Sequence, residues 1–186
     1  MNLTVITHSG SFIGGGHLSR CLTLADCLKS NEIHIKWIVN ENAGYFLKRK
    51  CFETTVFATP FDDKRIDDFD NSDFFIVDSY DPRKEFYAGL RKKGQLIVID
   101  DFRNRPVEQY ADILINYNIG AEKLPYEKRK DQLFLLGPKY SLIRKEYWNL
   151  EPSKGDYCLF VAGSSDIKNT SEKMVEIWDQ KWALLL

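Results

Sequence analysis

A run of three glycines followed by a histidine stands near the start of the chain, at Gly14, Gly15, Gly16 and His17. Glycines let a backbone approach a phosphate closely, and the first turn of a helix offers free amide donors and the positive end of its dipole. A histidine there can act as a general base, with a capping or merely exposed histidine as the alternative. Arg20 follows on the same helical face and is expected to bind a phosphate or a carboxylate. The pattern predicts an anion-binding loop beside a candidate base.

Carboxylates directly follow two of the later predicted strands. Asp78-Ser79-Tyr80 ends one of them, and Asp100-Asp101 ends the next. Because the carboxyl ends of parallel strands share one edge of a sheet, we expect both groups around the crevice that holds His17. A carboxylate there could orient the imidazole or bind sugar hydroxyls, and Tyr80 could bond to a ligand or stack on it. Capping of the next helix is the alternative interpretation for both groups.

Composition and glycine spacing exclude several other classes of site. The glycines fall at positions 10, 14, 15 and 16, which fits neither the dinucleotide pattern G-x-G-x-x-G nor the P-loop. Hydrophobic residues make up 44% of the chain and charged residues 28%, with a formal net charge of -1, as in a soluble globular protein. Basic residues are scattered among acidic ones, so no nucleic-acid partner is expected. The acidic stretch 62–73 lacks the glycine and closing glutamate of a calcium loop, and is expected to be a surface connection without a metal.

Strand and helix patterns alternate along the first 150 residues. Apolar and β-branched runs predict strands at 3–8, 33–39, 54–57, 74–78, 95–100, 113–116 and 132–136. Helical spacing predicts helices at 18–28, 43–50, 84–93 and 141–150. This rhythm predicts an α/β fold with a Rossmann-like, doubly wound, mostly parallel sheet over residues 1–150.

Residues 151–186 are expected to begin a second domain. Residues 151–155 predict a linker, 157–161 a strand, and the segment up to Lys181 a helix, after which the chain is apolar to Leu186. A single strand and helix cannot bury a core of their own. We therefore expect the rest of a longer protein, the first domain or a partner chain to cover residues 157–186.

The remaining expectations concern histidines, cysteines and cellular location. His8 and His34 are expected to be structural. The cysteines are widely spaced without a C-x-x-C pair, and are expected to be reduced and mostly buried; they are Cys21, Cys27, Cys51 and Cys158. The N-terminus lacks a signal peptide pattern, and no apolar run approaches the ~18 residues of a membrane span. A cytoplasmic protein without a membrane partner is expected.

Four ordered motifs resemble one enzyme family. They are Gly14-x-Gly16-His17-x-x-Arg20-Cys21-Leu22-x-Leu24-Ala25, Val77-Asp78-Ser79-Tyr80, Ile99-Asp100-Asp101 and Leu136-Gly137-Pro138-x-Tyr140-x-Leu142-x-Arg144. The series resembles the UDP-sugar hydrolases of pseudaminic acid biosynthesis, which are related to spore-coat polysaccharide proteins and, more distantly, to MurG-type glycosyltransferases. The resemblance covers about residues 1–170.

The resemblance implies two Rossmann-like domains in a GT-B arrangement and a reaction without metal or cofactor. It implies UDP-2,4-diacetamido-2,4,6-trideoxy-β-L-altropyranose as the substrate, with water attacking the anomeric carbon and UDP leaving. His17 matches the family's essential histidine, Tyr80 a cleft residue, and Asp100 and Asp101 a pair of acids.

The resemblance extends into the expected second domain, where residues 162–166 and Asn169 match a G-G-S-D-x-x-x-N segment. Ala162 departs from the first glycine, and a methyl group there would crowd a phosphate-facing loop. A glycosyltransferase of the same architecture and an inactive remnant of the enzyme are the alternatives.

Overall fold

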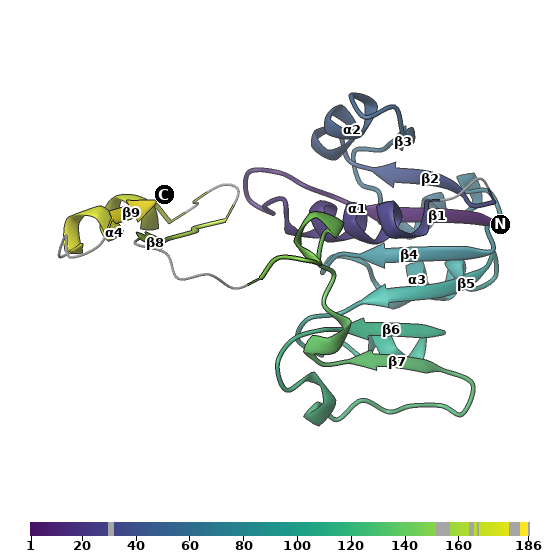
Figure 1. Ribbon diagram of the computed structural model, residues 1–186. Coiled ribbons are helices and arrows are strands. Elements are labelled where there is room, and N and C mark those ends of the chain that lie inside the picture. The colour runs from purple at the N-terminus through teal and green to yellow at the C-terminus, as the bar shows by residue number, and fades with distance from the viewer. Residues whose placement is uncertain (30–31, 152–156, 164–165, 167, 179–182, 186) are drawn as a thin grey trace.

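The computed structural model describes residues 1–29, 32–151, 157–163, 166, 168–178 and 183–185 (Figure 1). Seven parallel strands form the main sheet in the order β3-β2-β1-β4-β5-β6-β7. The strands are β1 Asn2–Thr7, β2 His34–Val39, β3 Glu53–Val56, β4 Phe74–Asp78, β5 Gln95–Ile99, β6 Ile113–Asn116 and β7 Leu133–Leu136. The predicted α/β fold with a doubly wound parallel sheet is confirmed.

Helices cover both faces of this sheet. Helices α1 (Gly16–Leu28) and α2 (Glu41–Lys48) pack on one face, and α3 (Lys84–Leu90) packs on the other with the 3-10 helix η1 (Asp63–Asp68), as Figure 1 shows for α1 and α3. Successive strand residues point to opposite faces, so Val5 joins the core under α1 while Ile6 joins the core under α3. Both faces are buried, which explains the near-continuous apolar strands.

The connections contain four further 3-10 turns, and one predicted helix is wrong. These turns are η2 Val107–Gln109, η3 Ala121–Lys123, η4 Pro138–Tyr140 and η5 Lys145–Tyr147. Residues 141–150 were expected to be helical, but only the single turn η5 forms there. Leu142 packs against the core, but most apolar side chains of this segment are exposed, at 50% for Ile143 and 59% for Trp148. Without a packed apolar face, a helix of this length is marginal in water.

Helix α3 ends at Leu90, three residues earlier than expected, and turns lead to Gly94. A Cβ at Gly94 would lie 2.0 Å from the carbonyl oxygen of Ser72, so packing requires glycine there. The expectation of mostly buried cysteines is also wrong. Only Cys21 is buried, whereas Cys27, Cys51 and Cys158 are exposed; all are free thiols.

The C-terminal elements form a separate two-stranded sheet. Strand β8 (Tyr157–Leu159) pairs in parallel with β9 (Ala183–Leu185), and α4 (Thr170–Ile177) lies between them in sequence. The predicted strand is shorter than expected and β9 was not predicted; Lys181, Leu186 and most of the predicted linker lie outside the described residues. Asp166 accepts hydrogen bonds from the Thr170 hydroxyl and from the Thr170 and Ser171 amides at the start of α4, and these bonds hold its pKa below the ordinary value. No helix in the described part of the chain is long and apolar enough to cross a bilayer.

Candidate active site

The candidate site lies where the strand order reverses. Strands β1 and β4 are neighbours, and ligands of doubly wound sheets bind outside the carboxyl ends of such a pair. The loop after β1 is folded back on itself by a hydrogen bond of 2.7 Å from the Gly14 amide to the Gly10 carbonyl. Asn40 holds this loop from β2, since its side chain accepts from the Ser9 amide at 3.2 Å and donates to the Ser9 carbonyl at 2.8 Å.

The three glycines have different roles in this loop. Gly14 has a φ of 79°, a left-handed conformation that favours glycine. Gly15 occupies the N-cap position, and α1 begins at Gly16 without an acidic residue in its first turn. A Cβ at Gly16 would meet no atom within 4 Å. The fold therefore does not require glycine at position 16, and the space beside the start of α1 is open.

His17 forms a buried pair with Asp78. The His17 Nδ1 atom lies 2.7 Å from Asp78 Oδ1, and the two side chains are 7% and 0% exposed. Arg20 also lies 3.1 Å from Nδ1, but the Asp78 contact is shorter and its carboxylate can only accept, so Nδ1 carries a proton and the neutral imidazole has its lone pair at Nε2. No group in the described residues hydrogen-bonds Nε2. The pair thus fixes an imidazole tautomer that can accept a proton at Nε2.

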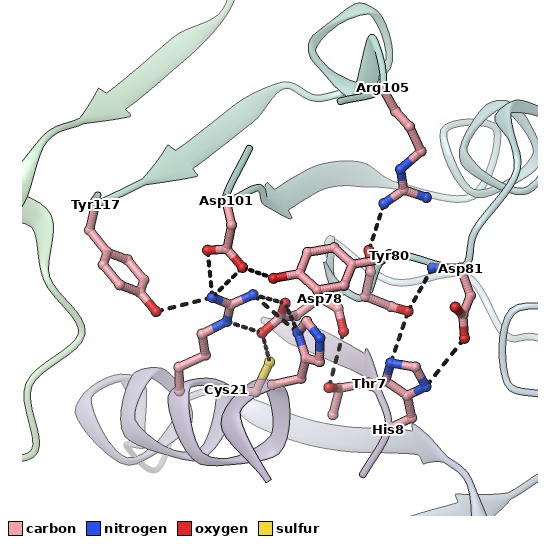
Figure 2. Close-up of polar contacts among 12 residues, drawn as sticks. Thr7, His8, Cys21, Asp78, Tyr80, Asp81, Asp101, Arg105 and Tyr117 are labelled. Carbon is pink, nitrogen blue, oxygen red and sulfur yellow. Dashed lines mark hydrogen bonds and ion pairs between the residues drawn. The ribbon is translucent and has the colours of Figure 1, made fainter. Parts of the chain in front are cut away.

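Arg20 clamps two carboxylates beside this pair, those of Asp78 and Asp101. Figure 2 labels both carboxylates together with Tyr80 and Tyr117. The Nε of Arg20 and one terminal nitrogen each lie 2.5 Å from an oxygen of Asp78. Its other terminal nitrogen donates to Asp101 at 2.7 and 3.0 Å and to the Tyr117 hydroxyl at 3.0 Å. Burial alone would lower the pKa of Arg20, but the hydrogen bonds and charge of the carboxylates raise it above its ordinary value. Of the two predicted partners for Arg20, the structure provides the carboxylate.

Tyr80 closes the cluster from the loop after β4. Its hydroxyl donates to Asp101, and the edge of its ring contacts the His17 ring with centroids 4.8 Å apart. Burial and the Asp101 carboxylate raise the pKa of Tyr80, so its phenol stays protonated. Burial opposes ionisation of Asp101, but the hydrogen bonds from Arg20 and Tyr80 outweigh it and hold the pKa of Asp101 below its ordinary value. The carboxyl ends of β1, β4 and β5 therefore meet at His17.

Asp100 and Asp101 separate although they are adjacent. Asp100 is 3% exposed and accepts from the Tyr126 hydroxyl at 2.5 Å and from the Arg103 amide at 2.9 Å. Its carboxylate thus holds the connection after β5, while Asp101 faces Arg20. Cys21, on α1 beneath the cluster, lies with its sulfur 3.6 Å from Asp78. Burial raises the pKa of the Cys21 thiol, which stays protonated.

His8 belongs to the site, although its sequence context did not indicate this. It directly follows β1, is 5% exposed, and lies with its ring centroid 5.3 Å from that of His17. Its Nε2 is 3.0 Å from Ser79 Oγ, and its Nδ1 is 3.4 Å from Asp81. Burial lowers the pKa of His8, against the opposing charge of Asp81. The position of His8 in the sequence could have indicated this, because a polar residue directly after the first strand lies at the switch point of a doubly wound sheet.

Two cavities flank the cluster along the same edge of the sheet. The His8 pocket has a volume of about 490 Å³ and is lined by His8, Ile13, Asn40, residues 58–64, Asp81 and Arg83. The Tyr117 pocket has about 550 Å³ and is lined by Arg20, Asp101, Phe102, residues 117–121 and Leu124. The described residues contain no group of three or more His, Cys, Asp or Glu side chains arranged to hold a metal ion.

Comparison with known proteins supports the architecture. No model of a known protein family matches the chain. The uncharacterized protein MJ1062 of Methanocaldococcus jannaschii is 28% identical over an alignment of 199 positions, which covers 95% of this chain and 39% of that protein. The crystal structure of Acinetobacter baumannii MurG matches with a TM-score of 0.53 and 12% identity, over 88% of this chain and 52% of that one. The chain therefore spans about half or less of the proteins it matches. Its fold is that of a Rossmann-like, GT-B-type N-terminal domain.

Proposed function

We propose that the protein is a nucleotide-sugar hydrolase that releases UDP from UDP-2,4-diacetamido-2,4,6-trideoxy-β-L-altropyranose. The observation that carries this proposal is the buried His17–Asp78 pair, 2.7 Å apart, beside a glycine loop at the switch point of the sheet. The resemblance of the four ordered motifs supplies the substrate. In this proposal, residues 1–150 form the domain of the catalytic loop and residues 151–186 begin the UDP-binding domain.

The proposed reaction is an inverting displacement at C1 of the sugar. His17 Nε2 takes a proton from water as the water oxygen bonds to C1. The bond between C1 and the phosphate oxygen breaks, and UDP leaves with the electron pair. Asp78 stabilises the resulting imidazolium, and two hydrogen bonds from Arg20 hold Asp78 in place. The proposed reaction uses no metal or cofactor.

The glycine loop is proposed to face the diphosphate. The open space at Gly16 and the amides of the first turn of α1 suit an anion, and the helix dipole adds to this attraction. Tyr80, at 42% exposure, is proposed to contact the sugar from the opposite wall. Asp101 and Arg20 position these groups, and Asp100 supports the loop that carries Asp101.

The test is UDP release from this sugar nucleotide by the purified 186-residue chain. The protein is used in excess over substrate, so that slow turnover is visible. His17→Ala should reduce the rate by a factor on the order of 10²–10⁴, the usual contribution of a general base. His34→Ala is the matched control, because His34 is exposed at the opposite edge of the sheet, and its rate should be unchanged. Equal rates for both variants would contradict the role of His17.

A glycosyltransferase is the second candidate, and the two cavities beside His17 favour it. A transferase needs room for a donor and an acceptor on either side of its base, whereas a hydrolase needs one ligand and water. The same assay separates the two, since UDP release that starts only when an acceptor alcohol is added identifies a transferase. Release in buffer alone identifies the hydrolase.

A further inference from the structure

The two cavities differ in whether their polar side chains already have hydrogen-bond or ion-pair partners. In the Tyr117 pocket, Arg20 and Asp101 bind each other, the Tyr117 hydroxyl accepts from Arg20, and Asn118 donates to the Asp101 carbonyl at 2.9 Å. In the described residues, by contrast, no hydrogen bond or ion pair engages the side chains of three residues of the His8 pocket, Asp63, Lys64 and Arg83. Of these two cavities, the His8 pocket is therefore the one whose described residues present unpaired charged groups to a ligand.

The charges of the His8 pocket disfavour an anionic occupant. Its lining carries three carboxylates, from Asp62, Asp63 and Asp81, against two cations, from Lys64 and Arg83. A diphosphate would meet a net negative wall. Hydroxyl and amide groups of a neutral ligand can instead donate to the carboxylates and accept from the cations. The lining thus selects an uncharged ligand that carries many hydrogen-bonding groups.

Three apolar residues form one further wall of the pocket, beside the polar Asn40 and Thr59. Pro60 is buried, Phe61 is half-buried, and Ile13 reaches the pocket from the glycine loop. Phe61 also supports His8 edge-on, with ring centroids 5.0 Å apart. The volume of about 490 Å³ lies in the range of small-molecule sites and exceeds the need of a single hexose ring. The apolar wall suits the C–H face of a pyranose ring, and the polar groups suit its hydroxyl and amide substituents.

The ring of His8 lies between the His8 pocket and the candidate base, His17. The Nε2 of His8 contacts Ser79 Oγ at 3.0 Å, and its Nδ1 lies 3.4 Å from the Asp81 carboxylate. His8 is therefore a wall of the pocket and not a free donor. A ligand seated against it would lie beside the His17 ring without blocking the glycine loop.

We propose that the His8 pocket binds an uncharged pyranose that carries hydroxyl and acylamino groups, with Asp63 and Arg83 as its main polar contacts. This inference rests on the proposed function, in which the pyranose is the sugar half of the substrate. It assigns sugar selectivity to the segment 58–64 and to the loop after β4. The diphosphate, in contrast, belongs to the glycine loop.

The test is binding of the free sugar 2,4-diacetamido-2,4,6-trideoxy-L-altrose, followed by NMR. The chain has three histidines, so its imidazole signals can be resolved and assigned by substitution. The sugar should shift the signals of His8 and leave those of His34 in place. Asp63→Asn and Arg83→Ala should each weaken binding roughly tenfold or more, the usual effect of losing a hydrogen bond to a charged group. The controls are Asp67→Asn and Lys84→Ala, exposed neighbours outside the pocket that should bind as the unchanged protein does.

The outcomes separate this inference from the proposed function. If the unchanged protein does not bind the sugar, or if both pocket variants bind it with unchanged affinity, the inference is overturned even when UDP release is normal. If the sugar binds and both variants weaken its binding while no UDP is released, the sugar site in the His8 pocket is supported and the hydrolase proposal is contradicted. In an active protein, the pocket variants should raise KM for the sugar nucleotide and leave the affinity for UDP alone unchanged.

Discussion

The two edges of the sheet carry similar histidine–carboxylate pairs in opposite surroundings. At the carboxyl edge, His17 and Asp78 are 2.7 Å apart and 7% and 0% exposed. At the amino edge, His34 and Glu53 are 2.8 Å apart and 55% and 49% exposed. Distance therefore does not distinguish the pairs, whereas burial does. Water screens the exposed pair, while the buried pair keeps a fixed geometry and a fixed tautomer.

Burial of the carboxyl-edge pair has a cost that Arg20 offsets. A buried carboxylate with a neutral imidazole as its only partner would be strongly destabilising. Two hydrogen bonds from Arg20 supply the missing positive charge, and Asp101 shares that charge with Asp78. At the amino edge, Lys36 bridges Glu53 and Asp70 at the surface, where such pairs contribute little. The site thus resembles a single cross-linked unit, and removal of one member affects the others.

The largest contrast is expected when each pair loses its carboxylate charge. Asp78→Asn leaves the buried Arg20 charge with fewer partners and should lower the free energy of unfolding by about 3 kcal/mol. The new amide can also donate to His17 Nδ1, which moves the imidazole proton to Nε2. That tautomer cannot accept a proton from water, so UDP release should fall as far as in His17→Ala.

Glu53→Gln is the matched change at the amino edge. It should lower the free energy of unfolding by about 1 kcal/mol or less, without an effect on UDP release. Urea unfolding at pH 7 measures both variants. Equal destabilisation by the two substitutions would show that burial does not separate the pairs in the way argued above.

Glycines offer a second contrast between the edges. Gly94 precedes β5 at the amino edge, where a Cβ would lie 2.0 Å from the Ser72 carbonyl oxygen, and Gly94→Ala should cost about 2 kcal/mol of stability or more. Gly16 lies at the carboxyl edge in open space, so Gly16→Ala should leave stability unchanged or raise it by up to about 1 kcal/mol. The same Gly16→Ala change should weaken UDP binding, because the methyl group occupies the proposed path of the diphosphate.

Thermal unfolding and calorimetric titration with UDP test this pair of glycine variants. A stable Gly16→Ala protein that binds UDP as tightly as the unchanged protein would remove the glycine loop from the proposed phosphate site. A destabilised Gly16→Ala protein would show that the fold, and not a ligand, requires that glycine.

Sequence patterns predicted the sheet well because each strand is a short run of apolar and β-branched residues that can be recognised from neighbouring positions alone. All seven main strands were predicted from β-branched and apolar runs, and parallel order followed from their alternation with helices. The false helix at 141–150 had suitable spacing as well. Most of its apolar residues, such as Ile143 and Trp148, stay exposed, and spacing alone cannot reveal that.

Sequence reasoning identified the members of the site better than their contacts. Strand ends placed Asp78, Tyr80 and Asp101 near His17, as the structure shows. The partition of Asp100 and Asp101 between two networks depends on which way each side chain points after β5, and neighbours in sequence give no such signal. The contribution of His8 depends on packing against His17 across two different elements, which is a tertiary property.

The smallest expected effect is the pH dependence that buried His8 gives to the stability of the fold. Burial lowers the pKa of His8 in the folded state, so the unfolded chain binds its proton first as the pH falls. The stability that comes from neutral His8 is fully present above the unfolded value of about 6.5 and is lost as the pH falls from there through the lowered folded pKa.

His8→Gln should therefore reduce the loss of unfolding free energy between pH 7 and pH 5. Asp81→Asn should steepen the loss, because Asp81 opposes the effect of burial on His8. Urea unfolding of the variants at both pH values measures these slopes. An unaltered slope in His8→Gln would show that His8 does not cause the acid sensitivity between pH 7 and pH 5; the lowered pKa of Asp101 removes stability only at lower pH, below an unfolded value of about 3.9.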